Sequence, residues 1–295
     1  MRWLALFLCL LPAAPVVAQS SSLDLLKVGI NAEAGAMGDA HVATADDAFA
    51  SFWNPAGLAA NRQNSLVAAH HIWVGNTRTY GAAGKMAVGE RAAVSAFLLA
   101  QDTGAGNVPG SNIQSVSTGA AIGVSAGVVR FGLAAKFLSE RVITTPSTGF
   151  GLDLGIQSTF PNSSVSIGAA LLNIGRMSKV AGIVTELPTM ARIGVAVYPF
   201  RIVSFDDAGD LLNAHLVLEY SRILPEDRGR FHAGAAVQLF EILTVRAGYI
   251  SNEDLRGPSG GLGLDASSFR FDYALVPFTQ GFGGPGHEMS LIYYW

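Results

Sequence analysis

The side chains that could carry acid–base or metal chemistry are few, and their spacing does not gather them. His70 and His71 are adjacent, so on a strand they point to opposite faces and cannot chelate one ion. His215 and His232 fall on the same face of neighbouring predicted strands and form the one candidate pair. The pattern places no carboxylate near them, and such a pair is more often a structural contact than a catalytic site.

Acidic and thiol groups add little chemistry. Asp46 and Asp47 form an acidic pair, but no histidine has ligand spacing to them. The only cysteine, Cys9, lies in the first apolar segment, so a chain that loses this segment has no thiol for a disulfide, a zinc site or a nucleophile. We therefore expect a protein without catalytic residues, metal or cofactor.

The composition points to a membrane environment. The chain has 295 residues, of which 50% are hydrophobic and 14% are charged, where a soluble domain has roughly 25% charged residues. The net charge of −3 provides no basic field for nucleic acid. A disordered chain would need low hydrophobicity and high charge, so we expect a folded protein with an apolar surface.

The first 18 residues have the three-part organisation of a secretory signal peptide. Arg2 gives a positive start, residues 3–11 are continuously apolar, and Val16-Val17-Ala18 offers a small-residue cleavage site before Gln19. The alternative is a membrane anchor, but residues 3–18 are too short to cross ~30 Å of hydrocarbon comfortably. We predict cleavage after residue 18 and export.

The remaining chain predicts a transmembrane barrel. No window after Ser20 has 18 consecutive apolar residues, the length that a membrane helix needs. Sheets can live in lipid only when closed, and their signature is segments of alternating hydrophobicity. A soluble sandwich would also alternate, but its exposed face would carry most of the charge. Here the polar face is mostly Gly, Ala, Ser and Thr with an occasional charge, which fits a lumen.

The alternation assigns particular polar residues to the lumen. Around residues 269–275, for example, Phe269, Phe271 and Tyr273 alternate with Arg270 and Asp272. These charges either favour a carboxylate-bearing ligand or pair across the lumen and stiffen the barrel. The predicted lumen-facing polar residues are Arg130, Lys136, Asp153, Arg192, Glu219, Arg230, Arg246, Arg270 and Asp272.

Fourteen strands are predicted, an even number as in bacterial barrels. Their ranges are 63–74, 77–87, 91–101, 116–126, 128–140, 149–159, 165–173, 189–201, 213–222, 230–240, 243–250, 259–265, 269–276 and 287–295. Connections alternate between short turns and long links such as 102–115, 142–148, 174–188 and 277–286, with two exceptions at 75–76 and 202–212. Short turns are periplasmic in such barrels, so we expect a periplasmic N-terminus and outward-facing long links.

Residues 19–62 precede the barrel of residues 63–295 and are not strand-like. Asp46 can cap a short helix, and Asn54 can cap a turn that begins at Pro55. We predict a packed plug or hatch in the barrel mouth. Its motif residues are Asp46, Asp47, Asn54, Pro55, Ala56, Gly57 and Leu58.

Three stretches resemble the PorV/PorQ family of outer-membrane barrels, within the wider FadL-like, fourteen-stranded group. They are AGAMGDAHVATADDAFASFWNPAGLA, KFLSERVITTPSTGFGLDLGIQ and IGAALLNIGRMSKVAGIVTELPTMARIGVAVYP, and the similarity covers most of residues 30–200. The Asn-Pro-Ala-Gly-Leu core is also shared by fatty-acid channels, whereas the middle stretches favour PorV/PorQ.

The resemblance implies a non-enzymatic role in type IX secretion. Such proteins escort substrates from a secretion translocon to attachment-complex proteins at the cell surface, binding the C-terminal signal domains of the secreted substrates. The long links, particularly 102–115, 174–188 and 277–286, would contact these partners. The alternative is a FadL-like channel for uptake of small hydrophobic molecules, with residues 19–62 as its hatch.

The last residues predict assembly in the outer membrane, among its lipid. Met289, Leu291, Tyr293 and Trp295 share one face of the final strand. A terminal strand that ends in an aromatic residue resembles the signal read by the barrel-assembly machinery. We therefore take Leu291, Tyr293 and Trp295 as this signal, with Ser290 where a glycine is usual.

Overall fold

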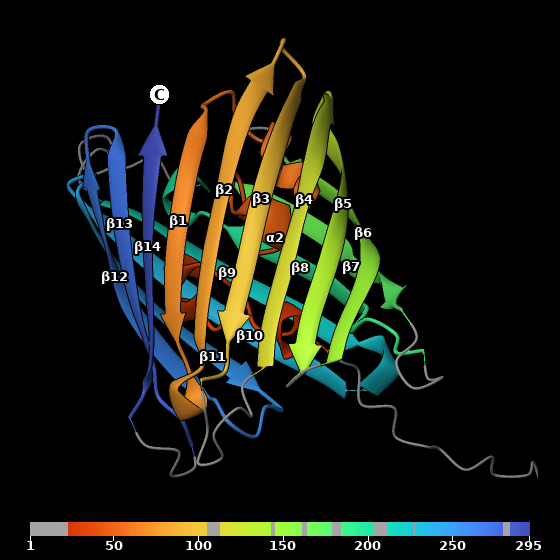
Figure 1. The fold of residues 1–295 in the computed structure, drawn as a ribbon. Helices are drawn as coiled ribbons and strands as arrows, with labels where there is room; N and C mark the ends of the chain where they lie inside the picture. Colours follow the sequence, from red (N-terminus) through yellow and green to blue (C-terminus); the bar gives the residue numbers. More distant parts are fainter. Residues whose placement is uncertain are drawn as a thin grey trace, which may run out of the picture.

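The computed structural model shows an antiparallel barrel closed around its own N-terminal segment (Figure 1). The described residues are 23–104, 113–142, 145–160, 164–178, 184–202, 212–226, 228–279 and 284–295. The predicted signal peptide lies outside these ranges. None of the helices within them has the length and apolar character that crossing a membrane requires.

Fourteen strands form the wall, and β1 pairs with β14 to close it, which confirms the predicted fold. They are β1 (Ser65–Ile72), β2 (Arg78–Val88), β3 (Ala92–Asp102), β4 (Ile113–Ala126), β5 (Val129–Val142), β6 (Thr145–Thr159), β7 (Val165–Met177), β8 (Met190–Val197), β9 (Leu212–Ile223), β10 (Arg228–Leu239), β11 (Leu243–Ser251), β12 (Pro258–Ala266), β13 (Phe269–Val276) and β14 (Gly286–Tyr294).

Two connections differ from the sequence prediction. The expected long link at 142–148 is short, because β5 runs to Val142 and β6 begins at Thr145. The strand expected at 189–201 ends at Val197, where Pro199 starts the helical turn α3 (Pro199–Ile202). Proline has no backbone N–H to extend the ladder, which explains this early end.

The two faces of the wall differ as the period of two requires. Phe269 and Phe271 point outward and are 50% and 44% exposed, whereas Asp272 points inward and is fully buried. An outward face built from such residues is energetically stable against lipid and unfavourable against water. The barrel therefore has the surface of a membrane-spanning protein.

The two ends of the barrel are named here by their connections. At the short-turn end lie the turns 89–91, 127–128, 240–242 and 267–268, together with the first residue of β1, Ser65. At the long-link end, the links 103–112, 178–189 and 277–285 leave and rejoin the wall, and the helical turns η3 (Val74–Asn76) and η5 (Leu224–Glu226) lie there.

Residues 23–60, called the plug below, occupy the lumen (Figure 1). The plug contains η1 (Asp24–Leu26), α1 (Ala32–Ala36), α2 (Ala50–Trp53) and η2 (Pro55–Ala59). Helix α1 packs against β11 to β14, and η2 packs against β3 to β6. The plug therefore touches nearly opposite sectors of the wall and fills the space between them.

Candidate functional site

The plug begins at the long-link end. Leu23 is buried with Leu138, Met177 and Leu187 near the long-link ends of β5 and β7. Lys27 Nζ lies 2.7 Å from Glu226 Oε1 in the link between β9 and β10. The plug therefore spans the barrel, because β1 starts at the short-turn end and the first described residues lie at the opposite end. The periplasmic location of the N-terminus stays a prediction.

Asp39 ties the plug to the long links. Its Oδ2 lies 2.7 Å from Arg256 Nη1, and both side chains are almost completely buried. Arg256 comes from the link between β11 and β12, and its Cζ lies 5.2 Å from the ring centre of Trp73. Although burial opposes ionisation, the Arg256 charge holds the pKa of Asp39 below its ordinary value. Trp73 also makes an edge contact with Phe278, so residues from three connections at this end pack around the arginine that binds Asp39.

Glu219 on β9 holds the next turn of the plug. Its Oε2 accepts hydrogen bonds from the backbone N–H groups of His41 and Val42, each at 2.8 Å. Its Oε1 pairs with Arg192 of β8, whose Nη2 donates to the backbone carbonyl of Asp39 at 2.6 Å. Arg192 also lies 4.6 Å over the ring of Trp53. Two predicted lumen residues therefore act together as a plug-binding pair.

The histidines are structural contacts and do not meet. His232 bonds the carbonyl of Gly38 through Nδ1 and the hydroxyl of Ser221 through Nε2, both at 2.7 Å. His215 lies opposite Ala236, four residues along the strand from His232, so the candidate pair is not formed. In the plug, burial lowers the pKa of His41 to about 4, so this ring is neutral at neutral pH.

The acidic pair of the plug lies near the short-turn end. Asp47 caps the turn before α2, because its Oδ1 accepts the Phe49 N–H at 2.7 Å. The capping residue is thus Asp47 and not Asp46, whose backbone carbonyl instead accepts a bond from Lys85 Nζ at 2.7 Å. Burial, followed by the neighbouring charge of Asp46, raises the pKa of Asp47 to about 7.

Asn54 begins η2, as the sequence predicts. Its Oδ1 accepts the Ala56 N–H at 3.2 Å, and Pro55 occupies the first position of the turn. Its Nδ2 donates to the carbonyls of Val42 at 2.8 Å and of Ile156 on β6 at 3.1 Å. A Cβ added to Gly155 would lie 2.1 Å from Asn54 Oδ1, so the wall needs glycine where the motif approaches it. Gly57 and Leu58 of the motif are buried in the same turn.

The other predicted lumen residues lie on the inward face as partnered groups. Lys136 Nζ bridges Asp153 Oδ2 and Asn173 Oδ1, each at 2.7 Å. Arg246 Nη1 lies 2.7 Å from Asp272 Oδ1. The remaining contacts join Arg130 to Thr159, Arg230 to Glu253, and Arg270 to Asp265 and to Glu33 of the plug. The pairing agrees with a stiffened, plug-binding wall.

Apolar wall residues gather in a separate sector. Those of β1 to β5 and β14 form one buried cluster with the plug residues Ile30, Phe49 and Trp53. On β1 to β4 and β14, the described inward positions between the level of Lys85, near the short-turn end, and that of His71, near the long-link end, are apolar, small or hydroxyl-bearing. On β5 the same stretch includes the paired Lys136. The wall part of the cluster consists of Val67, Ala69, Ala83, Ala93, Phe97, Leu99, Ala121, Ala134 and Ile292.

Two internal cavities flank the plug. One of about 40 Å3 lies beneath residues 25–30 and is bordered by Trp53, Phe97 and Leu99. The other, of about 190 Å3, is polar and is bordered by Glu33, Arg246 and other side chains. The first could hold little more than a water molecule, so the apolar sector is sealed while the plug is in place.

Sequence reasoning missed Asp39, Trp73 and Arg256. These residues lie in turns and links, where no period predicts the direction of a side chain. Asp39 follows Gly38, and both have positive φ, at 63° and 65°. The Gly-Asp step was therefore a turn signal, but nothing in it identifies a partner more than 200 residues away in the chain.

The predicted assembly signal lies on the outward face of the barrel. Leu291, Tyr293 and Trp295 are 45%, 38% and 53% exposed. Tyr293 stacks on Trp295 with ring centres 5.6 Å apart. Their recognition by the assembly machinery remains a prediction.

The fold is similar to that of solved hydrocarbon transporters. The Ralstonia pickettii toluene transporter TbuX superposes with a TM-score of 0.59 and 13% identity, covering 90% of this chain and 97% of its own. The P. putida toluene transporter TodX gives 0.58 and 12%, covering 90% and 98%. A TodX monoaromatic hydrocarbon channel mutant gives 0.57 and 12%, covering 92% and 99%. Neither a family model nor a curated protein sequence matches the chain.

At this identity the similarity establishes the fold, which fits the FadL-like barrel that the sequence resemblance implies. The structural match covers nearly the whole length of both transporters. The narrower PorV/PorQ resemblance, and the secretion partners that it implies, stay predictions.

Proposed function

We propose that this protein is an outer-membrane channel for small hydrophobic molecules, closed in the described state by the plug. The observation that carries the proposal is the apolar sector of the wall on β1 to β5 and β14, which runs beside the plug. A pore for polar solutes has a polar, water-filled interior. A path lined by Val67, Phe97 and Leu99 instead favours apolar solutes by the hydrophobic effect.

The attachment of the plug supports the same proposal. The plug is joined covalently to the wall at its end near Ser65, and its other contacts are noncovalent. The apolar cluster can therefore open without breaking any strand pair of the barrel. The fold that this chain shares with the two toluene transporters is consistent with such a passage.

A disulfide between plug and wall tests the proposal. Ser51 Oγ in α2 lies 2.7 Å from Ser95 Oγ on β3, and both side chains are buried. Replacing both, Ser51→Cys and Ser95→Cys, should give one bridge, because the chain has no cysteine after residue 9. In vesicles with a lipopolysaccharide outer leaflet, which apolar solutes cross slowly, the oxidised variant should take up a small aromatic hydrocarbon no faster than the same vesicles without protein. Reduction should restore uptake.

Each single-cysteine variant is the matched control, since it carries the substitution without the bridge. Uptake by these controls should not respond to oxidant or reductant. If the bridged barrel transports the hydrocarbon as fast as its reduced form, the plug does not gate a hydrophobic path. If the unmodified protein gives no uptake above the same lipopolysaccharide-covered vesicles without protein, the channel proposal is wrong.

The escort role in type IX secretion is not carried further, because it rests on the sequence resemblance. Parts of the long links that would bind secretion partners lie outside the described residues. A pull-down of the tagged protein from solubilised outer membrane remains the measurement that bears on that prediction.

A further inference from the structure

The outward faces of the strands carry charge at one end only. Among the described strand positions that point to the lipid side, the charged residues are Arg78, Asp102, Arg141, Arg176 and Arg222. All five lie at the long-link ends of β2, β3, β5, β7 and β9. Outward positions at the short-turn ends are apolar or small, as at Val88, Val129 and Phe269. The two ends of the barrel therefore present different electrostatic surfaces to the membrane.

The described outward strand positions at the long-link end, called the long-link rim below, are net basic. Asp102 lies opposite Arg78 in the β2–β3 register, and Glu186 lies opposite Arg176 in an isolated backbone β-bridge. Four arginines thus stand against two acidic residues. Arg141 lies opposite Gln114 on one side and Pro146 on the other, so the strand register gives it no acidic neighbour. Arginine binds phosphate through planar, bidentate hydrogen bonds.

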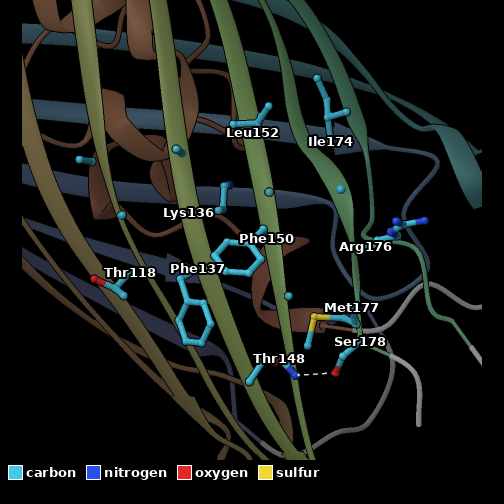
Figure 2. A pocket seen from close by; sticks show the side chains of 16 residues that line it. Thr118, Lys136, Phe137, Thr148, Phe150, Leu152, Ile174, Arg176, Met177 and Ser178 are labelled. Carbon is cyan, nitrogen blue, oxygen red and sulfur yellow. Dashed lines mark hydrogen bonds between the residues drawn. The ribbon is translucent and has the colours of Figure 1, made fainter. Parts of the chain in front are cut away.

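An apolar groove of about 990 Å3 leads to this rim on the outer surface of β4 to β7 (Figure 2). Its floor contains the small outward residues Ala120 and Ala135, which lie opposite each other. Phe137 and Phe150 form one wall and make an edge contact with ring centres 5.4 Å apart. Arg176 lies directly opposite Phe150 in the β6–β7 register, so a basic group stands beside the apolar surface.

A bulge in the wall shapes the groove. The β6–β7 register shifts between Leu152 and Leu154, opposite Asn173, whose φ is 61°. On the inner side the bulge is fixed by the Asn173 N–H donating to Asp153 Oδ1 at 2.6 Å. Such bulges bend a strand and redirect its side chains. The groove is therefore formed by the backbone geometry of β6 and β7 and does not depend on the conformation of single side chains.

We propose that the groove and the basic rim bind a lipid with a phosphorylated, anionic headgroup from the leaflet at the long-link end. The apolar floor and the two phenylalanines would contact an acyl chain. Arg141 and Arg176 would contact phosphate oxygens. The partner is identified by charge complementarity, because basic outward residues are confined to one leaflet's headgroup level. This interaction goes beyond the proposed channel function and does not depend on it.

Lipid binding by the purified full-length protein tests the proposal. Native mass spectrometry from a neutral detergent would compare bis-phosphorylated lipid A, its monophosphorylated form and phosphatidylcholine. We expect retention of the bis-phosphorylated lipid and about tenfold weaker retention of each of the others, as the loss of a charge-assisted bond predicts. The double variant Arg141→Gln, Arg176→Gln should weaken lipid A binding by about tenfold or more.

Two controls separate the rim and the groove from general effects. Arg91→Gln removes an exposed arginine from the turn at the opposite end and should leave binding unchanged. Ala120→Phe fills the groove floor and should weaken binding, whereas Ala82→Phe adds the same ring outward on β2, away from the groove. Heat-modified gel migration confirms that each variant is folded.

Equal retention of lipid A by the Arg141→Gln, Arg176→Gln variant would overturn the proposal. So would equal binding of phosphatidylcholine and lipid A by the unmodified protein, since the rim would then not select phosphate charge. Loss of binding in Arg91→Gln would show that the effect is general electrostatics rather than a site at the long-link rim.

Discussion

At the scale of single residues, buried charged groups of the barrel interior pair within the wall, as Lys136 does with Asp153, or across the plug–wall boundary, as Arg256 does with Asp39. Glu219 satisfies two backbone N–H groups of the plug and one arginine of the wall. Unpaired buried charges are costly, so each partner must be present for the plug to stay docked. The polar residues thus fix the position of the plug, while the apolar cluster supplies most of its burial.

Asp47 predicts a pH dependence of stability. Its pKa is raised to about 7 in the folded protein by burial and then by Asp46, so folding favours its protonated form. The stabilisation is complete below the ordinary aspartate pKa of 3.8 and is lost as the pH rises through about 7. Between about pH 5 and about pH 8.5, the wild-type protein should lose up to about 3 kcal/mol relative to Asp47→Asn, because the loss levels off above the folded pKa.

Thermal unfolding in detergent measures this difference. Asp47→Asn keeps an oxygen for the Phe49 N–H and cannot ionise, so it is the matched control. Parallel pH profiles for the two proteins would show that ionisation of Asp47 does not oppose docking of the plug.

Residue types could be placed from the sequence, but their partners could not. The period of two assigned Arg192, Glu219 and Asp272 to one face of their strands, because side-chain direction in a strand is a local property. The bond between Asp39 and Arg256 joins two irregular segments. Its prediction would require the three-dimensional course of both, which no local pattern contains.

At the scale of elements, glycines on β5 and β6 leave the space that the turn η2 occupies. A Cβ on Gly155 would meet Asn54 Oδ1 at 2.1 Å, and one on Gly132 would meet the Ala56 nitrogen at 2.1 Å. Contacts this short require the turn to move. The packing of the Asn-Pro-Ala sequence therefore depends both on the Asn54 cap and on wall residues without a Cβ on β5 and β6.

Gly155→Ala should displace η2 and loosen the plug, at a cost of about 1–3 kcal/mol. In a Ser51→Cys background, maleimide should label the buried cysteine faster once Gly155 is replaced. The matched control is Gly84→Ala, because a Cβ there meets only Leu66 Cδ1 at 3.7 Å, an ordinary contact. Equal labelling rates in the two variants would mean that the wall does not hold η2 through this glycine.

All fourteen strands could be predicted, because alternation and turn residues are local signals repeated along the chain. The errors came where a local signal was weak. Residues 142–148 contain three threonines, a proline and a serine and look like a link, yet pairing with β5 extends β6 to Thr145. Tertiary pairing here overrides the turn tendency of the sequence.

At the scale of the whole molecule, the plug and the wall have separable roles. The seam between β1 and β14 closes the sheet without any contribution from plug backbone. Deleting residues 23–60 should therefore leave a folded barrel, detected by heat-modified gel migration. The open lumen would expose the inward charges of β8 to β13 and should pass small sugars as well as hydrocarbons.

Liposome swelling with sugars measures this opening. The full-length protein is the control and should be impermeable to them, because the plug fills the lumen. A folded but sugar-impermeable deletion variant would show that something other than the plug closes the barrel.

The course of the plug could not be predicted from the sequence. Short turns and long links define two ends, and the start of β1 correctly falls at the short-turn end. The direction in which residues 23–60 run depends on contacts such as Lys27 with Glu226, between segments far apart in the chain. Neither composition nor periodicity carries that information.

The junction between plug and β1 has a consequence for biogenesis. Ser65, the first residue of the seam strand, accepts a bond from the plug's Ala48 N–H at 3.0 Å, so the strand that closes the barrel is the one tethered to its contents. Inserting the plug into an already closed barrel would move its polar groups past the closely packed apolar wall. Zipping β1 to β14 around a segment already laid on β8 to β13 avoids that step. Insertion and closure would then be a single event, and a nascent barrel delayed at its seam would already carry the plug on its inner face.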